Sequence, residues 1–323
     1  MKETNKTKYK ADQWFADGNR ISYNLENKKI TESIVDSSLK IWSKVINNNQ
    51  ESHLTMMPGF PDGSFGWAAT EEHLSTVNNS ERLYIEYIGM GDSDKPDKYI
   101  YSVYERADMI EALWQYHNVK STSLITFDFS SLVALELLSR QIERINAGEI
   151  LETTIKNLLT INGGLFSDSH THPLLTTPLL KTPIGKMGTK IAQNSQFAFN
   201  LMMKDLWSKE YKVSKEELVE NFNAITRRNG AIFMSNAARF VDEHKENNKR
   251  WDFKRIFLNT YPNIKYIVAG SEQDQFEYKQ VQKAKYQLEH LGLKIKMFPG
   301  GHMTTSEQPH LIANTIAELT FMD

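Results

Sequence analysis

The chain has 323 residues, with 40 acidic and 38 basic side chains and a net charge of −2. This length suits one large α/β domain with an insertion, and the even charge balance argues against a nucleic acid partner. The absence of cysteine excludes disulfides, thiolate catalysis and cysteine-based metal sites. No apolar run reaches the roughly 18 residues of a membrane span, and none follows the basic N-terminus. We therefore expect a soluble, cytoplasmic monomer or homodimer that acts on a small apolar substrate, without a membrane partner, metal or cofactor.

Short, nearly continuous apolar runs recur along the chain and are typical of strands that are covered on both faces. They occupy residues 20–23, 53–57, 82–88, 123–127, 157–161, 265–269 and 293–298. Helical patterns occupy residues 104–116, 132–147, 276–291 and 309–320. Strands that alternate with helices predict an α/β fold with a mostly parallel, doubly wound sheet, whose functional loops lie at the carboxyl ends of the strands.

One long segment interrupts the alternation. Residues 165–246 contain no convincing strand, and they include helical patterns and a proline-rich stretch, "HTHPLLTTPLLKTPIG". We interpret residues 165–246 as an inserted helical cap between two parts of a core, residues 1–164 and 247–323. A group of apolar cap residues would either line a hydrophobic pocket or pack, and we expect packing for most of them. The group consists of Phe197, Phe199, Leu201, Met202 and Met203.

Four loops that follow predicted strands carry unusual chemistry. They are "PGFPDGSFGW" after residues 53–57, "DFSS" after 123–127, "GSEQDQF" after 265–269 and "PGGHMTT" after 293–298. In a parallel sheet these loops share one edge. The side chains of Asp128, Asp274 and His302 and the backbone of Phe60 are therefore expected to converge.

The order of these motifs resembles the α/β-hydrolase superfamily. "PGFP", "GMGDSDKP", a corner in which a strand meets an aspartate and then a helix, and "GGH" follow one another over nearly the whole chain. The corner resembles the aspartate-nucleophile branch of epoxide hydrolases and haloalkane dehalogenases. "DFSSLVALELLSR" and "INGGLFSDSHTHPLL" look most like the mesoderm-specific-transcript-like members. The resemblance implies an α/β-hydrolase fold with an inserted cap.

Steric requirements place Asp128 at the apex of the corner. The nucleophile of this fold sits on a strained turn that needs small neighbours. With Asp128 at the apex the neighbours are Thr126, Ser130 and Ser131, whereas with Ser130 at the apex two of them would be bulky and aliphatic. Serines here replace the usual glycine of the family, and Phe127 stands where histidine is common. The helix N-terminus behind Asp128 should hold its pKa low, although an aspartate that only caps this helix would occupy the same position.

A carboxylate nucleophile restricts the reaction to displacement at a saturated carbon, as in epoxides and alkyl halides, because the resulting ester can be hydrolysed. The resemblance implies that His302 activates the water and that an acid in the preceding loop orients His302. We expect this acid to be Asp274, with Glu272 as a rival because the loop is one residue longer than usual. By the same resemblance, the N–H groups of Phe60 and Phe129 would form the oxyanion hole.

The side chains of Phe60 and Phe129 have no N–H donor for a departing halide, which favours an epoxide over a haloalkane as the substrate. Epoxide opening needs an acid, and related enzymes use cap tyrosines. Between residues 165 and 250 the only tyrosine is Tyr211, for which a simple role at the start of a helix is an equal alternative. Other candidates for this acid are His170, His172 and Trp207.

Two alternatives stay open. One is a haloalkane dehalogenase or a β-lactone-processing relative with donors that the sequence does not identify. The other is a ligand-binding protein that retains the fold without catalysis. The serines of the corner and Pro58, which replaces the histidine of the usual His-Gly pair, favour this second alternative.

Overall fold

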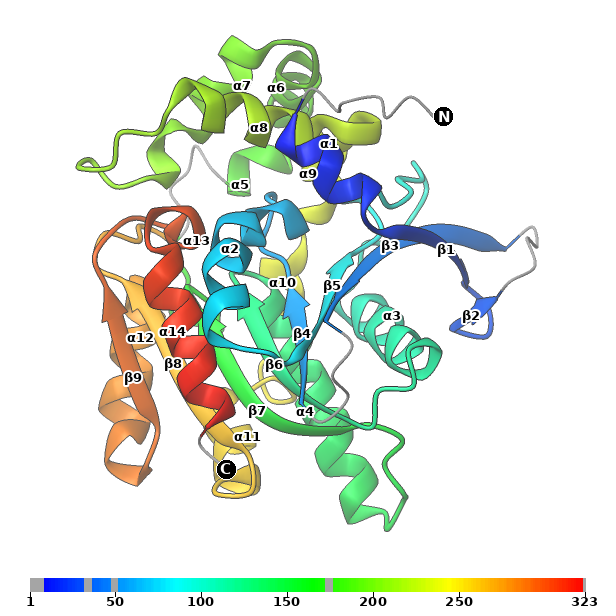
Figure 1. Ribbon diagram of the computed structural model, residues 1–323, viewed down its shortest axis with the longest axis vertical. Coiled ribbons are helices and arrows are strands. Elements are labelled where there is room, and N and C mark those ends of the chain that lie inside the picture. Colours follow the sequence, from blue (N-terminus) through cyan, green and yellow to red (C-terminus); the bar gives the residue numbers. More distant parts are fainter. Residues whose placement is uncertain (1–8, 32–36, 48–51, 172–176, 322–323) are drawn as a thin grey trace.

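The computed structural model describes residues 9–31, 37–47, 52–171 and 177–321. A twisted sheet of nine strands in the order β2-β1-β3-β5-β4-β6-β7-β8-β9 runs through this part of the chain (Figure 1). The strands are β1 (Asn19–Asn24), β2 (Lys29–Thr31), β3 (Ser38–Ile46), β4 (His53–Met57), β5 (Glu81–Glu86), β6 (Ser121–Phe127), β7 (Thr154–Ile161), β8 (Lys265–Ser271) and β9 (Lys294–Phe298). Neighbours from β5 to β9 pair in parallel, and β1, β2 and β3 form an antiparallel edge. The predicted α/β fold class is confirmed.

The central strands form where the sequence is continuously apolar. Every residue of β4 and β5 is buried, and in β6 only the first residue is partly exposed. The sequence patterns missed β2 and β3. Strand β3 reads "SLKIWSKVI", in which lysines and serines interrupt the apolar residues because the strand lies in the antiparallel edge and three of its nine residues are buried.

Helices cover both faces of the sheet (Figure 1). One face carries α1 (Lys10–Ala16), α2 (Ala68–Val77) and α14 (Pro309–Thr320), whose apolar residues join one core cluster with β4 and β6. The other face carries α3 (Val103–Tyr116), α4 (Ser130–Asn146), α11 (Phe253–Thr260) and α12 (Tyr278–Leu288), which contribute to a second cluster. The sheet is therefore doubly wound, and the loops at its carboxyl edge are left free to form a site.

The segment between β7 and β8 contains α5 (Thr177–Leu180), α6 (Pro183–Asn194), α7 (Gln196–Met203), α8 (Lys215–Thr226), α9 (Gly230–Ala237), α10 (Phe240–Glu246) and then α11. Helices α6 to α9 lie together at one end of the molecule (Figure 1). The N-terminal helix α1 packs against α8, where the carboxylate of Glu220 accepts hydrogen bonds from the backbone N–H groups of Lys10 and Ala11, both at 2.9 Å. The proposed domain boundaries at residues 165 and 246 stay a prediction.

The expectation that most apolar residues of α7 pack inside the cap is wrong. Phe199 and Met203 are buried, but Phe197 is 81% exposed, Leu201 55% and Met202 36%. The helical period explains the difference, because residues four apart share a face and only the face of Phe199 and Met203 meets the rest of the cap.

In the described residues, no helix combines the length and the apolar character that crossing a bilayer requires.

Candidate active site

The corner between β6 and α4 holds Asp128 in a left-handed backbone conformation, with φ of +52°. A residue with a Cβ rarely adopts this conformation, so the surroundings must fix it. The N–H of Asp128 donates to the carbonyl oxygen of Ile161 at 3.0 Å, and the hydroxyl of Ser131 donates to the carbonyl oxygen of Asp128 at 2.8 Å. The strained turn lifts the Asp128 carboxylate out of the strand at the carboxyl edge of the sheet.

The serines that follow Asp128 fill a tightly packed space. A Cβ on Gly163 would lie 2.7 Å from the Cβ of Ser131, so the loop after β7 is already packed against the first turn of α4. The hydroxyl of Ser130 donates to the carbonyl oxygen of Pro58 and lies 3.1 Å from the hydroxyl of Tyr87. These buried hydroxyls therefore have partners, which explains how serines replace glycine at this corner.

The structure brings Asp128, His302 and Asp274 together, and all three are buried. His302 Nδ1 lies 3.0 Å from Asp274 Oδ1, and His302 Nε2 lies 3.6 Å from Asp128 Oδ1. The other carboxylate oxygen of Asp128, Oδ2, accepts a hydrogen bond from the N–H of Phe60 at 3.0 Å. Glu272 is exposed, and its backbone N–H bonds to the carbonyl of Phe298, so the rival acid does not lie at His302.

The electrostatics of the site differ from expectation at Asp128. Burial raises its pKa, and this effect outweighs His302 and the N–H groups of Phe129 and Phe60, which lower it. The expectation of a low pKa is therefore wrong, because the helix N-terminus does not compensate for the lost water. Burial by itself would lower the pKa of His302, but the carboxylates around it, led by Asp274, raise it to about 9. His302 is therefore protonated at neutral pH.

Aromatic side chains form one wall beside the Asp128 carboxylate. The rings of Phe60, Phe129 and Phe240 pack with centroids 5.4 to 6.3 Å apart. The guanidinium of Arg106 lies 4.7 Å from the centroid of the Phe129 ring, and its nitrogens have no hydrogen-bond partner among the described residues. Phe240 comes from α10, so the predicted cap contributes to this wall. These rings belong to the hydrophobic core and make the surroundings of the corner at Asp128 apolar.

The structure does not bring Tyr211 to the Asp128 carboxylate. Its hydroxyl donates to Glu217 Oε2 at 3.0 Å. Tyr211 lines a cavity of about 440 Å³ together with Asp62 and Met303, and Asp128 is not among the lining residues. Of the other candidate acids, Trp207 is buried among apolar cap residues and Met303, and His172 lies outside the described residues.

His170 belongs to a buried chain of hydrogen bonds that the sequence did not indicate. Its Nδ1 lies 2.9 Å from Glu277 Oε1, and its Nε2 lies 2.7 Å from Nδ1 of His244 on α10. Burial lowers the pKa of His170 to about 4 and that of His244 to about 3, and it raises the pKa of Glu277. Both imidazoles are therefore neutral at pH 7, and His170 is a poor acid for a leaving group.

Asn162 is a further residue that sequence reasoning missed. It follows β7 with φ of +47°, and its side-chain nitrogen donates to the carbonyl oxygen of His302 at 2.9 Å. Its side-chain oxygen accepts from the N–H of Ser271 at 2.9 Å. Asn162 thus connects the loop that contains His302 to the end of β8 through two hydrogen bonds. The only signal in the sequence is an Asn-Gly pair directly after a strand.

Among the described residues, no cluster of three or more His, Asp or Glu side chains is arranged to hold a metal ion.

The chain is similar in sequence to several known proteins. No protein-family model matches the chain. The mesoderm-specific transcript homolog protein of Bos taurus is 29% identical over 202 residues, which cover 61% of this chain and 58% of that protein. The chain thus spans less than two thirds of this curated relative. A cis-3-alkyl-4-alkyloxetan-2-one decarboxylase of Shewanella oneidensis is 31% identical over 133 residues, 40% of this chain and 38% of that enzyme.

Solved structures cover more of the chain at lower identity. The haloalkane dehalogenase DbeA of Bradyrhizobium elkani aligns with a TM-score of 0.69 and 16% identity, over 94% of this chain and 97% of that one. The epoxide hydrolase CorEH aligns with a TM-score of 0.64 and 13% identity, over 94% and 98%. The chain therefore has the α/β-hydrolase fold, and its resemblance to mesoderm-specific transcript proteins, first visible in its motifs, is confirmed.

Proposed function

We propose that the protein is a hydrolase in which Asp128 attacks an apolar epoxide and His302 then activates the water that releases the product. The position of the two carboxylate oxygens carries this proposal. Oδ2 accepts from the N–H of Phe60, whereas Oδ1 faces His302 Nε2 at 3.6 Å, where a substrate carbon could approach it. This arrangement supports a role for Oδ1 as the attacking oxygen and for Oδ2 as the future ester carbonyl oxygen.

In the first step, Asp128 Oδ1 forms a bond to an epoxide carbon, and the carbon–oxygen bond of the ring breaks. We assign the proton that the resulting alkoxide takes up to His302 Nε2. His302 carries this proton because its pKa is about 9. The competing donor, Tyr211, is hydrogen-bonded to Glu217, and Phe60 and Phe129 offer no side-chain donor. The wall of phenylalanine rings would hold the apolar part of the substrate.

In the second step, the ester of Asp128 no longer carries the negative charge that helped to raise the pKa of His302. The neutral imidazole then takes a proton from water, and the hydroxide attacks the ester carbonyl carbon. The N–H groups of Phe60 and Phe129 stabilise the oxyanion that forms on Oδ2. The diol leaves with the proton that His302 returns, and Asp128 then passes its own proton back to His302.

Isotope labelling in a single turnover tests this route. With enzyme in excess over styrene oxide in H₂¹⁸O, the diol should contain no ¹⁸O, because its new oxygen comes from Asp128. The peptide that contains Asp128 should gain one ¹⁸O atom, which tandem mass spectrometry can locate. Label in the diol of the first turnover would instead mean that water attacks the epoxide directly.

A four-membered cyclic ester is the second candidate substrate, because the name of the matched Shewanella oneidensis enzyme specifies an oxetan-2-one. Release of carbon dioxide from such a β-lactone would identify this reaction. A haloalkane is less suitable, because neither Phe60 nor Phe129 has a side-chain donor for the halide. Binding of a ligand without any turnover would instead support a non-catalytic role.

A further inference from the structure

Helix α6 presents apolar side chains to the exterior of the cap. Ile184 is 68% exposed, Met187 60% and Ile191 53%. Their spacing of three and four residues places them on one face of the helix, while Gly185, Thr189 and Ala192 are buried. The outer face of α6 is therefore an apolar stripe without a partner among the described residues.

Helix α7 carries further exposed apolar side chains. Phe197, Leu201 and Met202 are 81%, 55% and 36% exposed, and α7 packs against α6. We call these six exposed side chains of α6 and α7 the cap patch. Large exposed apolar side chains that occur singly are ordinary, but several of them on two helices that pack together favour an interaction surface.

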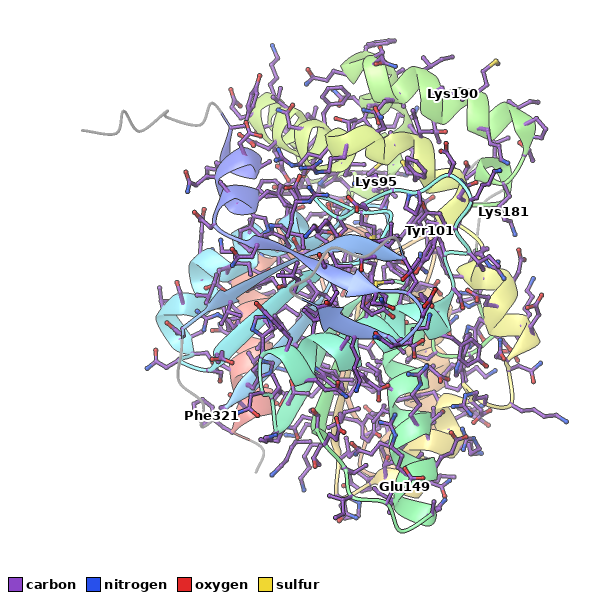
Figure 2. All side chains as sticks on the ribbon, turned by 90° about the vertical axis from the view of Figure 1, so that its right-hand side faces the viewer. Lys95, Tyr101, Glu149, Lys181, Lys190 and Phe321 are labelled. Atoms are coloured by element: carbon purple, nitrogen blue, oxygen red, sulfur yellow. The ribbon has the colours of Figure 1, made fainter. Side chains whose placement is uncertain are left out.

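The segment that carries the cap patch is basic, although exposed Asp205 follows it directly and the neighbouring helix α8 carries glutamates. Residues 169–204 contain no Asp or Glu, although the whole chain has two more acidic than basic residues. In the same segment Lys181, Lys186, Lys190 and Lys204 are exposed. Lys181 pairs with Asp242 at 2.5 Å, whereas the other three form no ion pair within the described part of the chain. Figure 2 shows Lys190 on α6 and Lys181 in the turn before α6, both away from the end of the molecule that holds Glu149.

We propose that the cap patch docks the protein on the surface of an anionic lipid membrane. Amphipathic helices that lie in a membrane interface combine Phe, Leu or Ile on one face with Lys along its borders. Helix α6 combines exposed Ile and Met with Lys186 and Lys190, and Lys204 directly follows α7. Phospholipid headgroups of negative charge attract such lysines, and the acyl boundary accepts the apolar side chains. A second copy of the chain fits less well, because pairing two cap patches would bring their lysines together.

This proposal replaces the expectation of no membrane partner, which rested on the net charge and on the lack of a spanning segment. Neither property describes α6 and α7, whose local composition differs from that of the chain as a whole. Docking through exposed side chains requires no helix to cross the bilayer. The proposal is also independent of the reaction at Asp128, since it concerns the outer face of the cap.

Vesicle flotation with the full chain tests the proposal. The protein should float with vesicles of phosphatidylcholine and phosphatidylglycerol, much less with phosphatidylcholine alone, and less at high salt. Phe197→Ser and the double variant Lys186→Glu, Lys190→Glu should each weaken binding by about tenfold or more. Ile150→Ser is the matched control, because Ile150 is 95% exposed but lies next to Glu149, far from the cap (Figure 2).

Thermal unfolding of each variant should match the wild type, because the changed side chains are exposed. Failure to bind anionic vesicles, or binding that Phe197→Ser and the lysine variant leave intact, would overturn the proposal. Light scattering adds a second criterion. A dimer that Phe197→Ser dissociates would assign the cap patch to a second copy of the chain and would equally overturn membrane docking.

Discussion

Replacement of Asp128 by asparagine should lower diol formation on the order of 10⁴-fold or more, a loss comparable to those caused by removal of other enzymatic nucleophiles. Asparagine has nearly the same shape, and its amide oxygen can still accept the N–H of Phe60. Its side chain cannot, however, attack the substrate as a carboxylate does. Chromatographic measurement of the diol under saturating epoxide would give the change in kcat.

The same substitution should leave the fold at least as stable as before. Burial raises the pKa of the Asp128 carboxyl, so the ionised form opposes folding above the ordinary pKa of an aspartate. The neutral amide introduced by Asp128→Asn would remove this cost, and the midpoint of thermal unfolding should stay equal or rise. Ser130→Ala serves as the control for the alternative apex of the corner. Activity that survives Asp128→Asn but not Ser130→Ala would assign the nucleophile to the serine.

Asp274→Asn should have the second largest effect, with kcat reduced by roughly 10² to 10⁴-fold. The Asp274 carboxylate holds Nδ1 of His302 at 3.0 Å and leads the charges that raise the pKa of this histidine to about 9. In the wild type, His302 loses its proton as the pH rises through about 9, so kcat/KM for an epoxide should fall above that pH. This fall of kcat/KM is the alkaline limb of the pH profile. In Asp274→Asn, which lacks the Asp274 charge, the alkaline limb should move to lower pH.

Glu272→Gln provides the matched control for Asp274→Asn. Glu272 lies two residues earlier in the same loop and is exposed, so its charge is screened by water. Its replacement should change neither kcat nor the position of the alkaline limb. If Glu272→Gln shifted the limb and Asp274→Asn did not, the orienting role would belong to Glu272, and the loop would have to rearrange when substrate binds.

The sequence predicted the sheet well where its strands are buried on both faces. Residues 53–57, for example, form β4 with the expected bounds. Strand β3 was missed because its lysines and serines break the apolar run in the partly exposed antiparallel edge. In α7, the sequence could not distinguish an inward from an outward apolar residue, because Phe197 and Phe199 have the same chemistry and only their neighbours differ.

The convergence of the four loops followed from the rule that functional loops share the carboxyl edge of a parallel sheet. The choice between Asp274 and Glu272 needed the loop conformation, because both carboxylates follow the same strand. The direction of the Tyr211 hydroxyl depends on Glu217, and the role of Asn162 depends on a hydrogen bond to the distant His302 loop. Contacts of this kind join residues from different loops, and no local pattern in the sequence encodes them.

The most direct test of the central claim, that Asp128 forms an ester with its substrate, is intact-mass spectrometry of His302→Gln. Glutamine can neither protonate the alkoxide nor act as the base for ester hydrolysis. Epoxides should therefore alkylate the variant more slowly, with water as the proton source, and haloalkanes need no proton, but in both cases the ester should accumulate once it forms. After incubation with a panel of epoxides and haloalkanes, the mass should increase by one covalently bound substrate, located on the peptide that contains Asp128. Asp128→Asn combined with His302→Gln should show no increase. An enzyme that stays unmodified across the panel, or a modification on another peptide, would contradict the account.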